Sequence, residues 1–469
     1  MASFLGGMFN VTGLDKHERL KFFLLTLAFA FIIGSYTIAK ELKDSIFVSV
    51  VGKDFLPMAK LLVIFLLIPA TLIYSRIVDL FRRYQVLALY SLFYGIILAL
   101  FTILLGHSSI GLYNTQASSH RLFGWLFYFV LEGYSPFVVS VFWAYLNSVS
   151  SPNEAKNCYP VMVAGSKAGG IITAFFAWYL LAHSKILEWC GHVNHDVVAH
   201  QLLMGIVSVM LLCVPVILYL LLKYVPGHYL HGYEAVYQME KKQQKENETQ
   251  GAGTGAFSGI KILFESPYVL GIFGLVFFYE TLNVVLNFQR IGILKDAATS
   301  MAGFTAAMFW QRLIMHSWGL VLSFFGLKYL MRRFEVRTCI MMVPVVVSAL
   351  LICFLVSDSP TMVMYAFIGL GTINYSLSVP LREALYIPAT KNMKFKAKAW
   401  IDSFGTKFSK GFGSLFASIT GFLPLGSTAL TSIYVGFFSV LMLMWFVTSW
   451  LLGKKYETAI KNNEIIGNE

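Results

Sequence analysis

The chain has 469 residues, of which 57% are hydrophobic and only 13% are charged. Because soluble proteins carry about 25% charged residues, this composition excludes a water-soluble enzyme and indicates a protein that crosses a membrane many times. Lys and Arg outnumber Asp and Glu by 36 to 24, which gives a net charge of +12. In a soluble protein this excess would suggest nucleic-acid binding, whereas in a membrane protein it is typical of cytoplasmic loops.

Twelve apolar stretches are long enough to cross a membrane, since a helical span needs about 20 residues to cover about 30 Å of hydrocarbon. No alternation of the barrel type occurs, so we predict an all-α polytopic protein. In chain order the predicted spans are Phe22–Ala39, Phe55–Tyr74, Val86–Leu105, Phe123–Leu146, Val161–Leu181, Leu202–Leu222, Tyr268–Phe288, Phe304–Leu327, Cys339–Val356, Met362–Val379, Phe404–Leu423 and Leu430–Leu452.

The spans fall into two halves that repeat one another. VDLFRRYQV after the second span matches KYLMRRFEV after the eighth, and LKDSI after the first matches LKDAA after the seventh. A polar, Gly-rich stretch between the halves is typical of a flexible linker. We therefore predict a six-helix bundle over residues 1–224, a cytoplasmic linker over 225–265 and a second bundle over 266–469. The pattern Asp79-x-x-Arg82-Arg83 also resembles a signature of the major facilitator superfamily, whose halves enclose a central site near the bilayer midplane.

Loop charge predicts the orientation. Basic residues gather in the loops on one side of the predicted spans, and the opposite loops carry few of them, so that side is expected to be the cytoplasm with both termini inside. The residues that set this side are Lys16, Arg19, Lys21, Arg76, Arg82, Arg83, Lys241, Lys242, Lys245, Arg332, Arg333, Arg337, Lys394, Lys396, Lys398, Lys454 and Lys455.

Ionisable residues at membrane depth are costly and predict functional positions. The candidates are Lys40, Lys43, Lys60, Glu132, Lys167, Glu280, Arg290, Arg312, Arg382, Lys407 and Lys410. Lys60 alternatively reaches the membrane surface from a span end, and Lys40 and Lys43 are alternatively anchors at the end of the first span. Glu132 and Glu280 have interhelical pairing as their alternative role. Arg312 lies one turn from His316, where a polar face and a packing role are equally compatible with the spacing.

The sign of the interior charge favours an anionic, phosphate-rich solute. Basic residues predominate, and Lys offers phosphate a point charge whereas Arg offers a two-pronged donor. Aromatic residues in the spans would stack on a base, although packing in the core or against lipid explains any single one equally well. Those considered are Tyr134, Trp143, Tyr279, Phe288 and Trp310.

Several kinds of site have no sequence support. The chain contains no GxxxxGK[ST], so transport is expected to be secondary rather than driven by ATP hydrolysis. We find no nucleophile–base pair, no carboxylates at metal spacing and no CxxC among the five cysteines, so we expect neither an enzyme, a disulfide framework, a metal site nor a cofactor. The glycines of GSKAGG (165–170) indicate close helix packing, and those of GAGTG indicate a loop.

Three long blocks carry a specific resemblance. KELKDSIFVSVVG, LEGYSPFVVSVFWAYLNSVSSPNEAKNCYPVMVAGSKAGGI and NYSLSVPLREALYIPATKNMKFKAKAWIDSFGTKFSKGFGSL stand in order across nearly the whole chain. They resemble the motifs of the nucleotide transporters of obligate intracellular bacteria and plastids, the ATP/ADP translocase type. These motifs are written R-x-x-K-D-x-L-V-V-T, E-L-W…F-W-x-x-x-N…E-A-K-R-x-Y-P and K-Y-S-L-F-D-P-x-K-E-M-A-Y-I-P…G-K-A-A-I-D.

The resemblance implies a substrate site at particular positions. Lys43, Glu132, Lys398, Asp402 and Lys410 match motif residues, and the substrate-binding set also includes Lys40. Arg382 stands where the family usually has lysine, which keeps the charge. The seventh span departs from the family pattern, because NVVLNFQR places Leu286 at the usual glutamate and Arg290 at the usual lysine, while Glu280 lies about one and a half turns earlier.

These features predict secondary active transport of nucleotides (ATP, ADP, GTP or related) across a bacterial inner membrane by alternating access. The absence of a plastid transit peptide favours the bacterial location. Phosphates would be held by Lys43, Arg290, Arg382 and Lys410, with Glu132 pairing a base in the empty site. Two alternatives stay open. One is a proton-coupled symporter of a non-adenine nucleotide, which is compatible with the departure at Leu286, and the other is a facilitator for another phosphorylated anion. The expected partners are a nucleotide, protons and the lipid bilayer, with no nucleic-acid polymer, and the expected state is a monomer.

Overall fold

The computed structural model describes residues 15–150, 152–184, 194–230, 258–322, 333–357, 360–386, 397–422 and 427–462, together with a few isolated positions between these ranges. Most of the predicted linker lies outside the described residues. The same holds for six of the basic loop residues used to predict orientation, namely Lys241, Lys242, Lys245, Arg332, Lys394 and Lys396.

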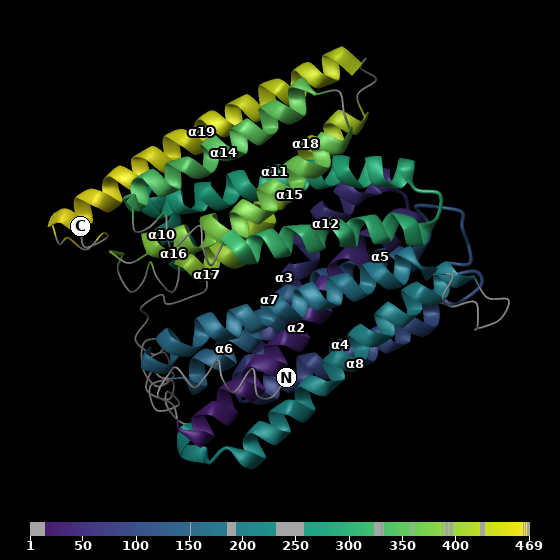
Figure 1. Ribbon diagram of the computed structural model, residues 1–469, viewed down its shortest axis with the longest axis horizontal. Coiled ribbons are helices and arrows are strands. Elements are labelled where there is room, and N and C mark those ends of the chain that lie inside the picture. The colour runs from purple at the N-terminus through teal and green to yellow at the C-terminus, as the bar shows by residue number, and fades with distance from the viewer. Residues whose placement is uncertain are drawn as a thin grey trace. The chain divides into compact units, whose positions relative to one another are not determined.

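The first six predicted spans are helical (Figure 1). A capping box starts the first helix, because the Asp15 side chain accepts from the Glu18 backbone and the Glu18 side chain accepts in return. The same helix ends beside Gly52, whose φ of +123° is a conformation that glycine adopts without strain. The elements are α2 (Lys16–Val50), η2 (Lys53–Phe55), α3 (Leu56–Leu80), α4 (Arg83–Leu105), α5 (Leu122–Glu132), the π-helix η3 (Ser135–Val139), α6 (Ser140–Val149), α7 (Pro152–Ala182), α8 (His195–Tyr224) and η5 (Gly227–Tyr229).

The second six predicted spans are also helical over their described residues. The elements are α10 (Ser258–Glu265), α11 (Pro267–Ala297), α12 (Met301–Val321), α14 (Val336–Val356), α15 (Pro360–Ile373), the π-helix η7 (Asn374–Ser378), α16 (Val379–Leu385), α17 (Lys398–Trp400), the π-helix η9 (Ile401–Gly405), α18 (Thr406–Phe422) and α19 (Ser427–Asn462). The all-α class predicted from the sequence is confirmed.

Among the described residues, eight helical stretches are long and apolar enough to cross a membrane. The four predicted spans outside this set correspond to α3, α7, α12 and α18, and each carries a candidate charge: Lys60, Lys167, Arg312 and Lys410 respectively. Charged side chains are rare on lipid-facing surfaces. Candidate charges also lie on α2 and α11, which belong to the set of eight, so charge is not confined to these four helices.

Contacts divide the described residues into two compact units. Unit 1 contains the described parts of Met1–Phe55, Phe65–Thr249 and Ala297–Leu313, and unit 2 contains those of Leu56–Ile64, Gln250–Asp296 and Ile314–Glu469. Each unit therefore includes a short stretch from the other half of the sequence. The two-bundle division at residues 224 and 266 stays a prediction.

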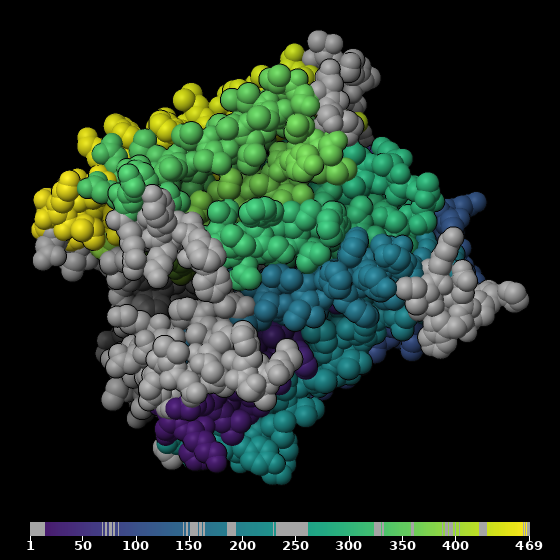
Figure 2. Space-filling model, viewed as in Figure 1, coloured from purple at the N-terminus to yellow at the C-terminus, as the bar shows by residue number. Residues whose placement is uncertain are grey.

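Close helix packing in each unit depends on glycine. In unit 1, α2 packs along both α7 and α8. A Cβ at Gly169 of α7 would lie 2.9 Å from the Ala30 carbonyl oxygen of α2, which confirms the packing predicted from GSKAGG. In unit 2, a Cβ at Gly413 of α18 would lie 2.7 Å from the Thr281 carbonyl oxygen of α11. In the same unit, α14 and α19 lie side by side (Figures 1 and 2).

Candidate functional site

π-helical turns adjoin three of the candidate positions. η3 begins three residues after Glu132, η7 leads into α16 with Arg382, and η9 contains Asp402. A proline lacks an amide N–H and its ring crowds the carbonyl four residues earlier. Pro136 has this effect on the Glu132 carbonyl at the start of η3. π turns occur frequently at functional sites, and here three of them adjoin candidate positions.

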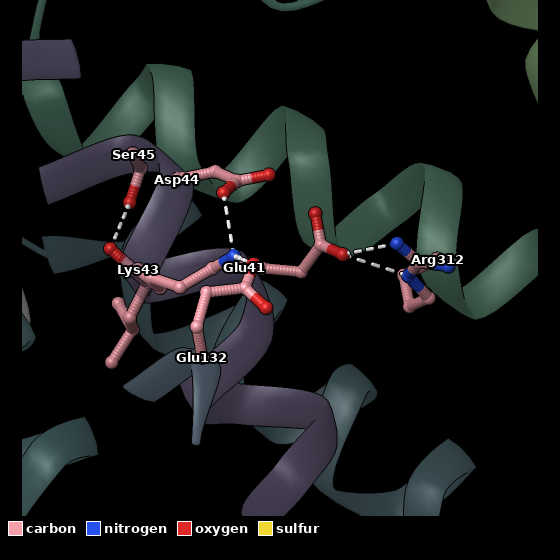
Figure 3. A network of polar contacts seen from close by, with 7 residues as sticks. Glu41, Lys43, Asp44, Ser45, Glu132 and Arg312 are labelled. Atoms are coloured by element: carbon pink, nitrogen blue, oxygen red, sulfur yellow. Dashed lines mark hydrogen bonds and ion pairs between the residues drawn. The ribbon is translucent and has the colours of Figure 1, made fainter. Parts of the chain in front are cut away.

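In unit 1, Lys43 of α2 lies between two carboxylates (Figure 3). Its Nζ is 2.5 Å from Oε1 of Glu132 and 3.2 Å from Oδ1 of Asp44. The same atom lies 4.2 Å from the centroid of the Tyr128 ring. The Lys43 side chain is only 7% exposed. One buried ammonium thus contacts two carboxylates and an aromatic ring, which compensates its charge away from water.

A second buried ion pair lies beside this cluster within unit 1. Nε of Arg312 on α12 donates to Oε1 of Glu41 at 2.8 Å, and Nη2 of Arg312 donates to the same oxygen (Figure 3). Both side chains are less than 10% exposed. Arg312 thus links α12 to α2 through a buried ion pair, which is compatible with a packing role.

Lys40 and His316 lie next to aromatic rings. Nζ of Lys40 is 5.8 Å from the centroid of the Tyr36 ring in unit 1. In unit 2, the His316 ring centroid is 6.3 Å from that of Tyr375. Lys40 is thus placed for a cation–π contact within its own helix rather than in the Lys43 ion cluster.

In unit 2, Glu280 of α11 faces Lys410 of α18. Oε2 of Glu280 and Nζ of Lys410 are 3.8 Å apart, and their side chains are 17% and 34% exposed respectively. The helices meet one residue further on, where the Thr281 hydroxyl donates to the Ser409 carbonyl at 3.3 Å. Glu280 therefore has a basic partner although it does not stand at the family's usual glutamate position.

Arg290 is fully buried on α11. Its guanidinium carbon lies 4.2 Å from the centroid of the Phe367 ring on α15. Arginine is well suited to such stacking because its planar guanidinium is weakly hydrated. Phe367 thus contacts Arg290, one of the residues predicted to bind phosphate.

The last motif block forms its own cluster in unit 2. Lys398 makes an ion pair with Glu383 and lies 5.5 Å from the centroid of the Tyr386 ring. Arg382 and Lys398 both act electrostatically on Asp402. This cluster is more exposed than the one around Lys43, because the Lys398 and Glu383 side chains are 30% and 46% exposed.

Comparison with known proteins identifies the family. A family model described as TLC ATP/ADP transporter matches residues 7–456. The chain belongs to this family. ADP,ATP carrier protein 3 of Rickettsia bellii is 22% identical over 496 residues, which cover 95% of this chain and 96% of the relative. The chloroplastic ADP,ATP carrier protein 1 of Arabidopsis thaliana is 24% identical over 505 residues, covering 95% of this chain and 74% of the relative.

Solved structures support the fold of this TLC-family chain. A bacterial homologue of the human lysosomal transporter Spinster, in an inward-facing and unoccupied conformation, matches with a TM-score of 0.58 at 14% identity and covers 95% of this chain and 99% of its own. A D-xylose-proton symporter matches with a TM-score of 0.59 at 11% identity, covering 93% and 96% respectively. The predicted polytopic, major-facilitator-like fold is confirmed.

Within each unit of this family member, some predicted residues meet and others do not. Lys43 meets Glu132, Glu280 meets Lys410, and Arg382, Lys398 and Asp402 form one neighbourhood. Five further partners of these residues or of Arg312 were not predicted as site residues. These partners are Glu41, Asp44, Tyr128, Phe367 and Glu383. Glu41 and Asp44 lie in KELKD, the start of the first motif block, so their neighbourhood to Lys43 could have been predicted from the sequence.

Proposed function

We propose that this chain is a secondary active transporter of nucleotides, in which a substrate phosphate replaces a carboxylate as the partner of Lys43. Membership of a family whose relatives are named ADP,ATP carriers supports the solute class. The observation that carries the mechanism is the burial of Lys43 against both Glu132 and Asp44. The two carboxylates compensate the charge of Lys43 until a substrate phosphate replaces one of them.

The cost of an unpaired buried charge explains why phosphate binding at Lys43 would be coupled to the release of Glu132. Removing one partner from a buried ion pair costs about 3–5 kcal/mol, because a charge is left without compensation. Lys43 without a carboxylate or a phosphate would meet this cost, so the lysine should stay paired throughout the cycle. A phosphate that takes over Lys43 releases Glu132, which is then able to accept a proton or another basic partner.

The other basic candidates complete the proposal. Arg290, Arg382 and Lys410 would hold further phosphate oxygens, with Glu280 pairing Lys410 when substrate is absent. Lys40, Lys398 and Asp402 belong to the same predicted set and would tune the local charge. The transporter would act in a bacterial inner membrane, with both termini in the cytoplasm and as a monomer.

A competition panel tests the solute class. The purified protein, reconstituted into liposomes, should accumulate labelled ATP or GTP, and unlabelled nucleotides should compete with the label. Nucleosides and inorganic phosphate at the same concentration should compete at least tenfold less well, because each lacks one part of the substrate. Equal competition by a simple phosphorylated sugar would instead support the facilitator for another phosphorylated anion.

A proton-coupled route is the second candidate, and the presence of two carboxylates beside Lys43 favours it. Protonation of either Glu132 or Asp44 would leave Lys43 paired with the other carboxylate. Leu286 at the usual glutamate position adds to the case against strict ATP/ADP exchange. Uptake that stops with a protonophore and needs no internal nucleotide supports symport. Uptake that requires internal nucleotide and ignores the protonophore supports exchange.

A further inference from the structure

A long apolar groove runs between α11 and α19, wholly within unit 2. Its volume is about 840 Å³, within the roughly 300–1,000 Å³ of ligand-binding pockets. Phe273 and Phe277 of α11 and Phe408 of α18 form part of its lining. It reaches from Met444 to Thr458 along α19, which at 1.5 Å per residue is about 21 Å. This is the shape required for an extended hydrocarbon chain.

Glycines on α11 form the floor of the groove. A Cβ at Gly271 would lie 2.8 Å from Leu452 of α19, and one at Gly274 would lie 3.3 Å from Thr448. These glycines let α11 and α19 approach closely, so the base of the groove is formed by backbone and small side chains. Met444 and Leu451 border the channel and are 51% and 53% exposed, as expected of residues that face lipid.

One end of the groove is basic. Among the described residues that line it, the charged ones are Lys454 and Lys455, both exposed, with Thr458 one turn further along. Nζ of Lys454 lies 5.7 Å from the Trp450 ring centroid, and the Arg337 guanidinium carbon lies 5.9 Å from the same centroid. Trp with flanking basic residues is typical of the membrane–water interface.

Apolar length with a basic end defines the chemistry of the occupant. The ligand must carry hydrocarbon of about the groove's length and a negative charge at one end, and it must reach the groove from the lipid phase. We propose that the groove between α11 and α19 binds one anionic phospholipid, with an acyl chain along Gly271 and Gly274 and its phosphate at Lys454 and Lys455. Basic pockets between transmembrane helices recognise anionic headgroups in this way.

Two variants separate the two ends of this site. Lys454→Gln with Lys455→Gln removes the charge and leaves the channel, whereas Leu451→Trp fills the channel and leaves the charge. Two matched controls on α8 alter an exposed leucine and lysine at a different helix end: Leu222→Trp and Lys223→Gln. All four are surface changes outside the proposed nucleotide site.

The measurement is native mass spectrometry of the detergent-purified full chain with equal amounts of phosphatidylglycerol and phosphatidylcholine of identical acyl chains. Wild type should retain phosphatidylglycerol in preference. In the Lys454/Lys455 double variant this preference should fall about 30-fold, because each lysine near an anionic headgroup contributes about fivefold. Leu451→Trp should lose bound lipid of both kinds, and the α8 controls should match wild type. Glycerol phosphate, which lacks acyl chains, should not bind.

Three results would overturn the proposal. One is equal retention of the two lipids by wild type. A second is an unchanged preference in the double variant, which would assign the lipid to another surface. The third is a preference that falls equally in the α8 controls, which would indicate only a general effect of surface charge. The inference does not depend on the transported solute, because lipid retention is measured without nucleotide.

Discussion

The contacts of Lys43 decide between two roles that its position in the sequence allowed. Its position at the end of a predicted span allowed it to be either an anchor at the membrane surface or a ligand for phosphate. Burial against Glu132 and Asp44 excludes the anchor, because an anchoring lysine extends its ammonium into water. The same geometry adds a requirement, since the lysine is not available to a substrate until a carboxylate leaves.

Glu132→Gln should separate binding from transport. The neutral amide cannot compensate Lys43 as the carboxylate does, so Lys43 becomes more available to phosphate while the proposed exchange of partners is lost. We expect the affinity for ATP to be equal to or higher than wild type and uptake into liposomes to fall at least tenfold. Wild-type uptake by this variant would remove Glu132 from the mechanism.

Glu41 and Arg312 should behave differently, as a pair that stabilises the fold. Either single change, Glu41→Gln or Arg312→Met, should destabilise the protein by about 3–5 kcal/mol, because a buried charge loses its partner. The double variant should recover much of that loss, since apolar or neutral replacements of both partners are often tolerated. Thermal unfolding in detergent measures the cycle. Losses that simply add in the double variant would show that the two residues do not depend on one another.

At the scale of helices, the spans were predictable whereas their interruptions were not. Apolar length alone located the helices, because hydrocarbon thickness sets the length of a span. A π turn adds one residue to a helical turn. The 3.6-residue periodicity of apolar residues in the sequence does not reveal where this happens. Pro136 was visible in the sequence, but its effect on the Glu132 carbonyl becomes clear only with η3 in place.

Pro136→Ala tests whether η3 matters for function. Alanine restores the amide that proline lacks and relieves the crowding at the Glu132 carbonyl, so α5 and α6 should join as a regular helix. We expect a melting temperature at or above that of wild type and uptake reduced at least tenfold. Pro69→Ala in α3 and Pro344→Ala in α14 are matched controls, because these prolines lie inside α-helices. Equal losses in all three variants would mean that η3 has no special role.

The start of α2 should respond to acid. The pKa of Asp15 is held below its usual value of 3.8, first by the hydrogen bond from the Glu18 backbone N–H and then by that from the Tyr229 hydroxyl. A carboxyl group with a lowered pKa contributes stability that is complete above pH 3.8 and is lost as the pH falls through its folded value. Amide protection in the first turn of α2, corrected for intrinsic exchange, should therefore fall below about pH 4.

Asp15→Asn is the matched variant for this effect, since asparagine caps helices as well as aspartate does without a charge. Its protection should be independent of pH across the same range. An identical acid response in the two proteins would place the titrating group elsewhere.

At the scale of the whole molecule, the sequence was sufficient to predict the fold class and the family. The ion pairs between charged residues could not be predicted from the sequence. Partners such as Glu41 and Arg312 are 271 positions apart in the chain and meet only through helix packing. The sequence predicts that Arg312 and Glu132 both lie at membrane depth. In the structure, Arg312 pairs with Glu41 and Glu132 pairs with Lys43.

Lys43 is proposed to bind a substrate phosphate in place of its carboxylate partners. Calorimetric titration of the purified protein with ATP and with adenosine isolates the contribution of the phosphates. Wild type should bind ATP far more tightly than adenosine. In Lys43→Gln the affinity for ATP should fall about 10- to 150-fold, as expected for a lost charged hydrogen bond, while that for adenosine stays unchanged. An ATP affinity in Lys43→Gln equal to that of wild type would contradict the account.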